Sequence, residues 1–230
     1  MFKHLKIGVR LGFAFASTLL LLVAISTVSY QRINELNDNI ELMVNGRFPK
    51  TVQANNIIDA INTVARLLRN AYIYTGEERA KALHQITPLR KIISDEMAKL
   101  EKSVKSDKGK EIVRKIITAR SAYVASQDKF TELLKVDKKN EIVTLMQGEL
   151  RKTQADYLKS VNEMIDFQTN MTTKAGKEAD AAANRAMTLI LTLSIVAFII
   201  ASALAWWITR SITRPINVAV DAATRLAEGD

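Results

Sequence analysis

Side chains able to bind an anion recur along the middle of the sequence, between two apolar stretches. They are arginines, hydroxyl-bearing residues and one amide. An arginine keeps its charge at physiological pH and presents a planar set of N–H donors that matches a carboxylate. Several arginines in one half-buried slot repel one another, and a ligand with two or three carboxylates relieves that repulsion. The pattern therefore predicts a site for a small anionic metabolite such as citrate, malate or succinate. The candidate ligand-binding residues are Arg66, Arg69, Thr87, Arg120, Tyr123, Gln127, Thr153 and Tyr157.

Two alternatives stay open on the sequence alone. Arg120 could point into solvent with Ala119 inside, and Tyr123 could be an ordinary core residue with its hydroxyl at the rim. The ligand could also be an aromatic acid or an amino acid that uses Tyr123 and Tyr157 instead of several arginines.

Helices are expected to carry these residues, because apolar positions recur in alternating steps of three and four. Four such patterns run through residues 31–185, with no strand alternation and no Gly-rich phosphate loop. One of them fails in its middle. Residues 116–130 read IITARSAYVASQDKF, which is apolar at its ends but small, polar or cationic between them. Four helices joined by short polar turns predict an all-α fold, an antiparallel up-down-up-down four-helix bundle.

Breaks in these helices are predicted from proline and turn residues. Pro49 removes a backbone donor and predicts a kink or short break in the first helix, which ends at residues 75–78. At residues 87–88 the second helix kinks or restarts, with Thr87 as N-cap and proline in the first helical position. Residues 105–110 and 135–140 form the remaining turns, and the fourth helix continues into the second apolar stretch.

The up-down order predicts which residues share a height. The first two helices meet near residue 76, and the last two meet near residue 138. Counting back from that tip brings the eight candidates, with Asn62 and Arg90, to one level. All four helices turn polar or cationic there, which predicts a cavity between them.

Two uncharged stretches are long enough to cross a membrane. Residues 11–29 and 187–207 contain no charged side chain, and each makes a helix of roughly 30 Å. A signal peptide is the alternative for the first, but the apolar part of signal peptides is about 7–15 residues, and no clear A-x-A cleavage site follows. We expect transmembrane helices at residues 11–30 and 186–208.

Basic residues orient these spans, because positive flanks stay in the cytoplasm. Residues 1–10 and 209–230 are therefore expected inside, and residues 31–185 outside. The basic flanking residues are Lys3, Lys6, Arg10, Arg210, Arg214 and Arg225.

Composition argues against several other classes of protein. The chain has no Cys, and its two histidines, His4 and His84, lie far apart in the sequence. Acidic residues fall on solvated helix faces without inward pairs, so we expect no metal site, no cofactor and no enzymatic activity. The net charge of +9 does not predict nucleic-acid binding, because part of it flanks the spans and the rest faces outward.

The C-terminal residues 208–230 read ITRSITRPINVAVDAATRLAEGD, in which Pro215 is expected to start a helix. This resembles a short control segment and the first helix of a HAMP linker, within which the sequence stops. With the two spans, the bundle and RLLRNAYIYTGEE at residues 66–78, the whole chain resembles the sensory half of a methyl-accepting chemotaxis protein.

The resemblance implies a homodimeric two-pass receptor in the bacterial inner membrane, with a periplasmic sensor domain that binds its ligand near the distal end of the bundle. A small piston-like or tilting displacement would pass through HAMP to a kinase complex of the CheA/CheW type. The implied partners are a small carboxylate, a second copy, membrane lipid and that complex, and nucleic acid is not among them. Two other functions stay open: the input half of a sensor histidine kinase or diguanylate cyclase, and a module that senses a periplasmic protein.

Overall fold

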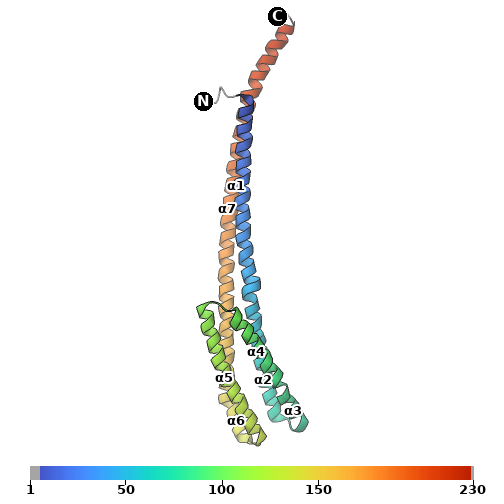
Figure 1. Cartoon of the computed structure of the whole chain (residues 1–230), viewed down its shortest axis with the longest axis vertical. Helices are drawn as coiled ribbons and strands as arrows, with labels where there is room; N and C mark the ends of the chain where they lie inside the picture. The colour runs from blue at the N-terminus through green and yellow to red at the C-terminus, as the bar shows by residue number, and fades with distance from the viewer. Residues whose placement is uncertain (1–5, 229–230) are drawn as a thin grey trace. The chain divides into compact units, whose positions relative to one another are not determined.

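The computed structural model describes residues 6–228, which are helical along almost their whole length (Figure 1). No β-strand occurs among these residues, as predicted. The chain divides into two compact units, one of residues 40–177 and one of residues 1–39 with 178–230. The elements are α1 (Ile7–Glu41), the π-helix η1 (Leu42–Arg47), α2 (Phe48–Ile73), α3 (Gly76–His84), α4 (Ile86–Ser103), α5 (Asp107–Lys135), α6 (Lys139–Gln147) and α7 (Glu149–Glu228).

The unit of residues 40–177 is the predicted four-helix bundle. Its first helix is α2, its second is α3 with α4, its third is α5, and its fourth is α6 with the start of α7. Successive helices are joined by short turns and run antiparallel (Figure 1). The predicted up-down-up-down fold is confirmed.

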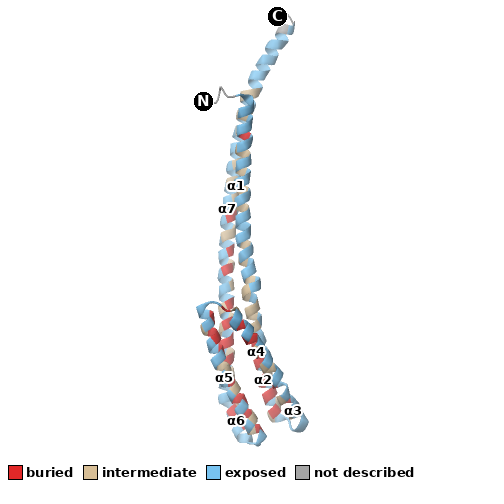
Figure 2. Ribbon diagram, in the orientation of Figure 1, coloured by how far each residue is buried: buried red, intermediate tan, exposed pale blue. Residues whose placement is uncertain are grey.

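The bundle is held together by one apolar cluster to which all four helices contribute (Figure 2). On α2, for example, Ile57, Ile61, Val64 and Leu68 recur at steps of three and four and are at most 1% exposed. Steps of three and four place side chains on one helix face. Burying each such side chain contributes about 1.5–3 kcal/mol, so packing of this face is the main stabilising term.

The turn between α4 and α5 depends on a close approach at Gly109. The Ser106 hydroxyl caps α5 by accepting a hydrogen bond from the Gly109 backbone N–H at 3.2 Å. A Cβ at Gly109 would lie 2.5 Å from Cγ1 of Val104 and 2.8 Å from Oγ of Ser106. Neither atom belongs to a long side chain that can swing away, so only glycine fits there.

We expect Gly109→Ala to lower the free energy of unfolding by about 1–3 kcal/mol, through overpacking and loss of the cap. Gly176→Ala is the matched control, because nothing lies within 4 Å of a Cβ at that helical position. Alanine should raise stability there by about 0.5–1 kcal/mol. Amide hydrogen exchange measures both effects, and a loss of the same size at the two sites would contradict the close approach.

Three predicted helix boundaries are wrong. Gln85, and not Thr87, occupies the N-cap of α4, so Thr87 lies inside the first turn. Pro88 is still tolerated, because N–H groups in the first turn have no intrahelical partner. The fourth bundle helix is interrupted at Gly148, with φ −104° and ψ −101°. Pro215 does not start a helix but lies inside α7, which continues through it.

The irregularity predicted at Pro49 is a π-helix. Residues 42–47 form η1, and Pro49 lies in the first turn of α2. Arg47 at the end of η1 donates from Nη1 to the Met171 carbonyl of α7 at 2.6 Å. This contact joins the first and fourth bundle helices.

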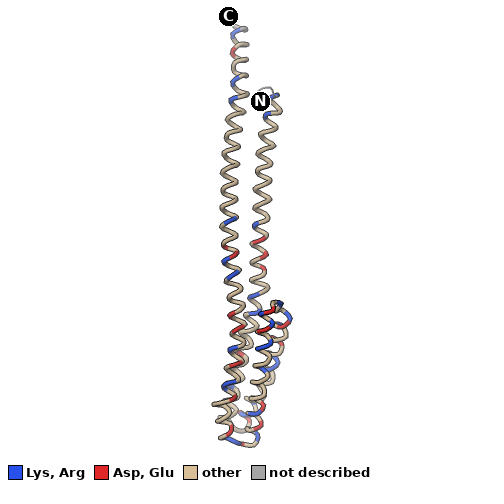
Figure 3. Tube along the Cα trace, turned by 90° about the vertical axis from the view of Figure 1, so that its left-hand side faces the viewer, with Lys and Arg blue, Asp and Glu red and all other residues tan. Residues whose placement is uncertain are grey.

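In the other unit, α1 up to Asn39 and α7 from Glu178 lie side by side, and each has a long stretch without charged residues (Figure 3). Among the described residues, these are two helical segments long and apolar enough to cross a membrane. Of the most apolar 18 residues of each segment, only 6% and 0% are buried, respectively. A core helix of a soluble protein buries most of such a stretch. At the end of the second stretch, the Arg210 guanidinium lies over the Trp206 ring, 5.5 Å from its centroid.

Candidate functional site

Two tyrosines meet in the core of the bundle, at the level where the sequence predicts a binding site. Tyr123 of α5 and Tyr157 of α7 are each 1% exposed. Their ring centroids lie 6.2 Å apart, with planes tilted by 51°. Both hydroxyl oxygens are buried, and neither has a hydrogen-bond partner among the described residues. A buried polar group left unpaired costs about 1–3 kcal/mol, so two of them side by side need an explanation beyond packing.

Electrostatics at these hydroxyls combines burial with nearby positive charge. Burial raises the pKa of Tyr157 to about 12 and also raises the pKa of Tyr123. Arg120 opposes the rise at Tyr157. At Tyr123 the rise is opposed by Gln127, which lies close without a hydrogen bond of ordinary geometry, and by the charges of Arg90 and Arg69. Both phenols therefore keep their protons at neutral pH and remain available as donors in a positive potential.

Arginines also connect α4 to α5 around this pair. Arg90 of α4 donates to Oε1 of Gln127 from Nε at 3.0 Å and from Nη2 at 2.8 Å, and to Asp128 at 2.8 Å. Arg120 of α5 donates from Nη2 to the Ser94 hydroxyl of α4 at 2.6 Å. With its oxygen occupied by Arg90, Gln127 has only its amide N–H groups left to offer.

On the other side of α5, hydroxyl groups connect it to α7. The Ser126 and Thr153 hydroxyl oxygens lie 2.7 Å apart, and Ser126 also donates to the Tyr123 carbonyl at 3.0 Å. Ser126 is fully buried, so this contact replaces the apolar packing expected at a bundle seam. The interruption of the apolar pattern within residues 116–130 thus corresponds to a polar layer inside the bundle.

Two surface grooves adjoin this polar layer. One, of about 280 Å³, is lined by Thr87 and Arg90 together with Leu68, Asp128 and Thr131. The other, of about 630 Å³, lies between α5 and α7 and is lined by Thr153, Ser160, Ala119, Ala122 and charged side chains.

The structure brings five of the eight candidate residues together: Arg120, Tyr123, Gln127, Thr153 and Tyr157. Arg66 and Arg69 are exposed on α2, although Arg69 is close enough to act on the pKa of Tyr123. Thr87 is exposed and meets the others only through its groove with Arg90. The buried part of this level consists of phenol, amide and hydroxyl groups, and the guanidinium groups surround it.

Both open questions about side-chain direction have an answer. Ala119 and Arg120 are each half-buried, and Arg120 lies along the helix interface to reach Ser94 instead of pointing into solvent. Tyr123 is a core residue, but its hydroxyl is buried and not at the rim.

The predicted site residues lack three members of the layer, Ser94, Ser126 and Asp128. Ser94 follows Arg90 by four positions and therefore lies on the same helix face, a spacing that was available in the sequence. Asp128 carried no signal, because a single acid beside a seam is usually solvated.

The fold is a helical bundle with a polar layer in its core, and bundle proteins build their ligand sites from side chains on facing helices. No group of three or more His, Cys, Asp or Glu side chains positioned to hold a metal occurs among residues 6–228. A family model described as a four helix bundle sensory module for signal transduction matches residues 4–183, and the chain belongs to this family. The resemblance to the sensory half of a methyl-accepting chemotaxis protein is thereby confirmed. No curated protein and no solved structure matches the chain.

Proposed function

We propose that this sensory module binds a small di- or tricarboxylate in the polar layer of the bundle. The observation that carries the proposal is the pair of buried, unpartnered tyrosine hydroxyls surrounded by arginines. Phenol donors and guanidinium groups are the partners that carboxylate oxygens require. A carboxylate placed there would satisfy both hydroxyls and gain from the positive potential.

The arginines around the layer retain unused capacity for a ligand. Of those at this level, Arg90 is paired with Asp128. Arg66, Arg69 and Arg120 have no carboxylate within ion-pair distance among the described residues. A ligand with several carboxylates would supply the missing negative charge, which favours an acid such as citrate, malate or succinate over a monoacid.

The groove at Thr87 and Arg90 offers a route of entry. Its volume of about 280 Å³ is slightly below the roughly 300–1,000 Å³ of drug-sized pockets and suits a small metabolite. Arg90 lines this groove and also holds Gln127, so a ligand that pairs with Arg90 would disturb the hydrogen bond next to Tyr123.

α7 provides the proposed path for the signal. It is one continuous helix from Glu149, near Thr153 and Tyr157, to Glu228 beyond the second apolar stretch. A helix transmits a displacement along its axis because its backbone hydrogen bonds resist stretching. Ligand binding between α5 and α7 would thus displace residues 209–230. We propose that these residues are a control segment and the first HAMP helix.

We further propose the cellular setting that the family resemblance implies. Residues 11–30 and 186–208 cross the bacterial inner membrane, residues 31–185 face the periplasm, and the N- and C-terminal segments are cytoplasmic. Two copies form the receptor, and the signal goes to a chemotaxis kinase complex. The apolar surface of both spans supports the membrane placement.

The test is calorimetry of the full chain in lipid nanodiscs against a panel of carboxylic acids. We expect one di- or tricarboxylate to bind, and Arg120→Ala to cost about 2–5 kcal/mol of binding free energy because a charged contact is lost. Arg66→Ala is expected to weaken binding as well. Arg151→Ala is the control, since Arg151 is an exposed arginine of α7 that takes part in none of the described hydrogen bonds of the polar layer.

Two results would contradict the proposal. An equal loss of affinity in Arg120→Ala and Arg151→Ala would mean that only the general charge of the bundle matters. No heat and no shift in melting temperature with any acid would favour a module that senses a periplasmic protein instead.

A further inference from the structure

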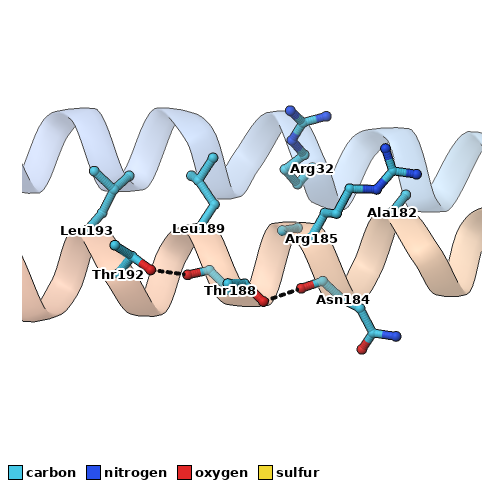
Figure 4. A pocket seen from close by; sticks show the side chains of 9 residues that line it. Arg32, Ala182, Asn184, Arg185, Thr188, Leu189, Thr192 and Leu193 are labelled. Carbon is cyan, nitrogen blue, oxygen red and sulfur yellow. Dashed lines mark hydrogen bonds between the residues drawn. The ribbon is translucent and has the colours of Figure 1, made fainter.

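A third groove lies outside the bundle, between α1 and α7 in the unit of residues 1–39 and 178–230 (Figure 4). It has a volume of about 760 Å³. Arg32 lines it from α1, and the remaining lining residues all come from α7, between Ala182 and Leu193.

The groove changes character along its length. Arg32 follows the first uncharged stretch closely, and Arg185 directly precedes the second. These two cations and Asn184 line one end. The other end is lined by Leu189 and Leu193, whose side chains point toward α1 (Figure 4). A ligand that fits must therefore be anionic at one end and apolar at the other.

Hydrogen-bond donors are available only at the cationic end. Arg185 donates from Nε to the Ala181 carbonyl of its own helix at 3.2 Å, and it has no carboxylate within ion-pair distance among the described residues. Arg32 pairs with Glu35 through Nη1 at 2.7 Å, which leaves its other N–H groups. The Thr188 and Thr192 hydroxyls donate to backbone carbonyls of α7, so they add no donor for an anion.

We infer that this groove binds an anionic phospholipid from the outer leaflet, with its phosphate at Arg32 and Arg185 and an acyl chain along Leu189 and Leu193. A free phosphate would leave the apolar end unused. A bilayer lipid presents both chemistries at the depth where the uncharged stretches end. Cations near a membrane surface attract anionic lipid, and arginine pairs well with phosphate. The inference goes beyond carboxylate sensing but rests on both stretches crossing the membrane.

The test is native mass spectrometry of the full chain, extracted in mild detergent with equal amounts of phosphatidylglycerol and phosphatidylcholine. We expect the chain to retain phosphatidylglycerol preferentially. Arg185→Leu should weaken that retention about fivefold, the effect of roughly 1 kcal/mol for one cation near a membrane surface. Arg32→Leu should act in the same direction. Lys177→Leu removes an exposed cation of α7 outside the groove and should leave the preference unchanged.

Several results would overturn the inference. Equal retention of the two lipids would do so, as would an equal effect of Lys177→Leu and Arg185→Leu. Displacement of the lipid by excess inorganic phosphate would make the groove a simple anion site. If Arg185→Leu or Arg32→Leu changes the ratio of monomer to dimer without changing the amount of bound lipid, a second copy covers the groove. Release of the chain from membranes by carbonate would instead refute the membrane placement, so the two failures are distinguishable.

Discussion

Replacing Tyr123 with alanine is expected to lower the free energy of unfolding of the bundle by about 3–5 kcal/mol. Tyr123 is 1% exposed, belongs to the shared core and packs against the ring of Tyr157. Removing the ring leaves a cavity between α5 and α7 that the surrounding helices can fill only in part, so the loss combines transfer and cavity terms. Amide hydrogen exchange in α5, with the full chain in nanodiscs, measures this free energy locally.

Tyr123→Phe is the control that isolates the hydroxyl. The ring stays, and the group removed is a buried hydroxyl without a partner among the described residues. Loss of an unpaired polar group is neutral or stabilising, so we expect the free energy of unfolding to stay the same or to rise by about 1 kcal/mol. If phenylalanine destabilises the bundle as much as alanine does, the hydroxyl is bonded in the folded protein.

The same pair of variants separates folding from ligand binding. If the hydroxyl donates to a carboxylate, Tyr123→Phe keeps its fold but binds the ligand more weakly, by roughly 0.5–3 kcal/mol. A purely structural tyrosine would show the opposite combination, with stability affected and affinity unchanged.

Helix number and order followed from the sequence because apolar periodicity reports burial directly. Ile61, Ala65 and Leu68 lie where the pattern places them, and all are buried. The residues at which helices begin and end were harder to predict. Pro88 fits anywhere in a first turn, so it could not decide whether the helix begins at Pro88 or, as found, at Ile86. Nothing around Gly148 distinguishes a break from a tolerated helical glycine.

The sequence predicted the height of the polar layer along the bundle more accurately than the direction in which each of its side chains points. Each residue turns a helix by about 100°, so a seam position and its neighbour cannot be told apart where neither is apolar. Arg66 therefore looked equivalent to Ala65, yet Ala65 is buried and Arg66 is exposed. Tertiary contacts then decide which long side chains turn inward, as Arg120 does toward Ser94.

Pro215 shows a further limit of sequence interpretation. A proline in a helix removes one backbone donor, which usually ends or kinks the helix. Here α7 continues through it, so no separate helix begins at that residue. The continuity matters for the proposed mechanism, because an unbroken helix passes a displacement onward without a joint at Pro215.

Cysteine labelling is expected to give an all-or-none result for the membrane topology. The chain has no Cys, so one substitution gives one reactive site. Ser121→Cys places a thiol on the exposed face of α5, and Thr224→Cys places one on exposed α7 beyond the second apolar stretch. A membrane-impermeant maleimide should label Cys at 121 fully in intact spheroplasts, and Cys at 224 only after permeabilisation.

A third substitution, Leu20→Cys, tests the span itself. Leu20 is 70% exposed on α1, so no part of this chain shields it from a reagent in water. Maleimide reacts with the thiolate, and a low-dielectric medium disfavours that charged form. A thiol at residue 20 should therefore stay unlabelled even after permeabilisation, because lipid covers a residue of the span, and should react once the chain is unfolded in denaturant. Labelling at residue 20 in native membranes, or at residue 224 in intact spheroplasts, would contradict the two-pass arrangement on which sensing across a membrane depends.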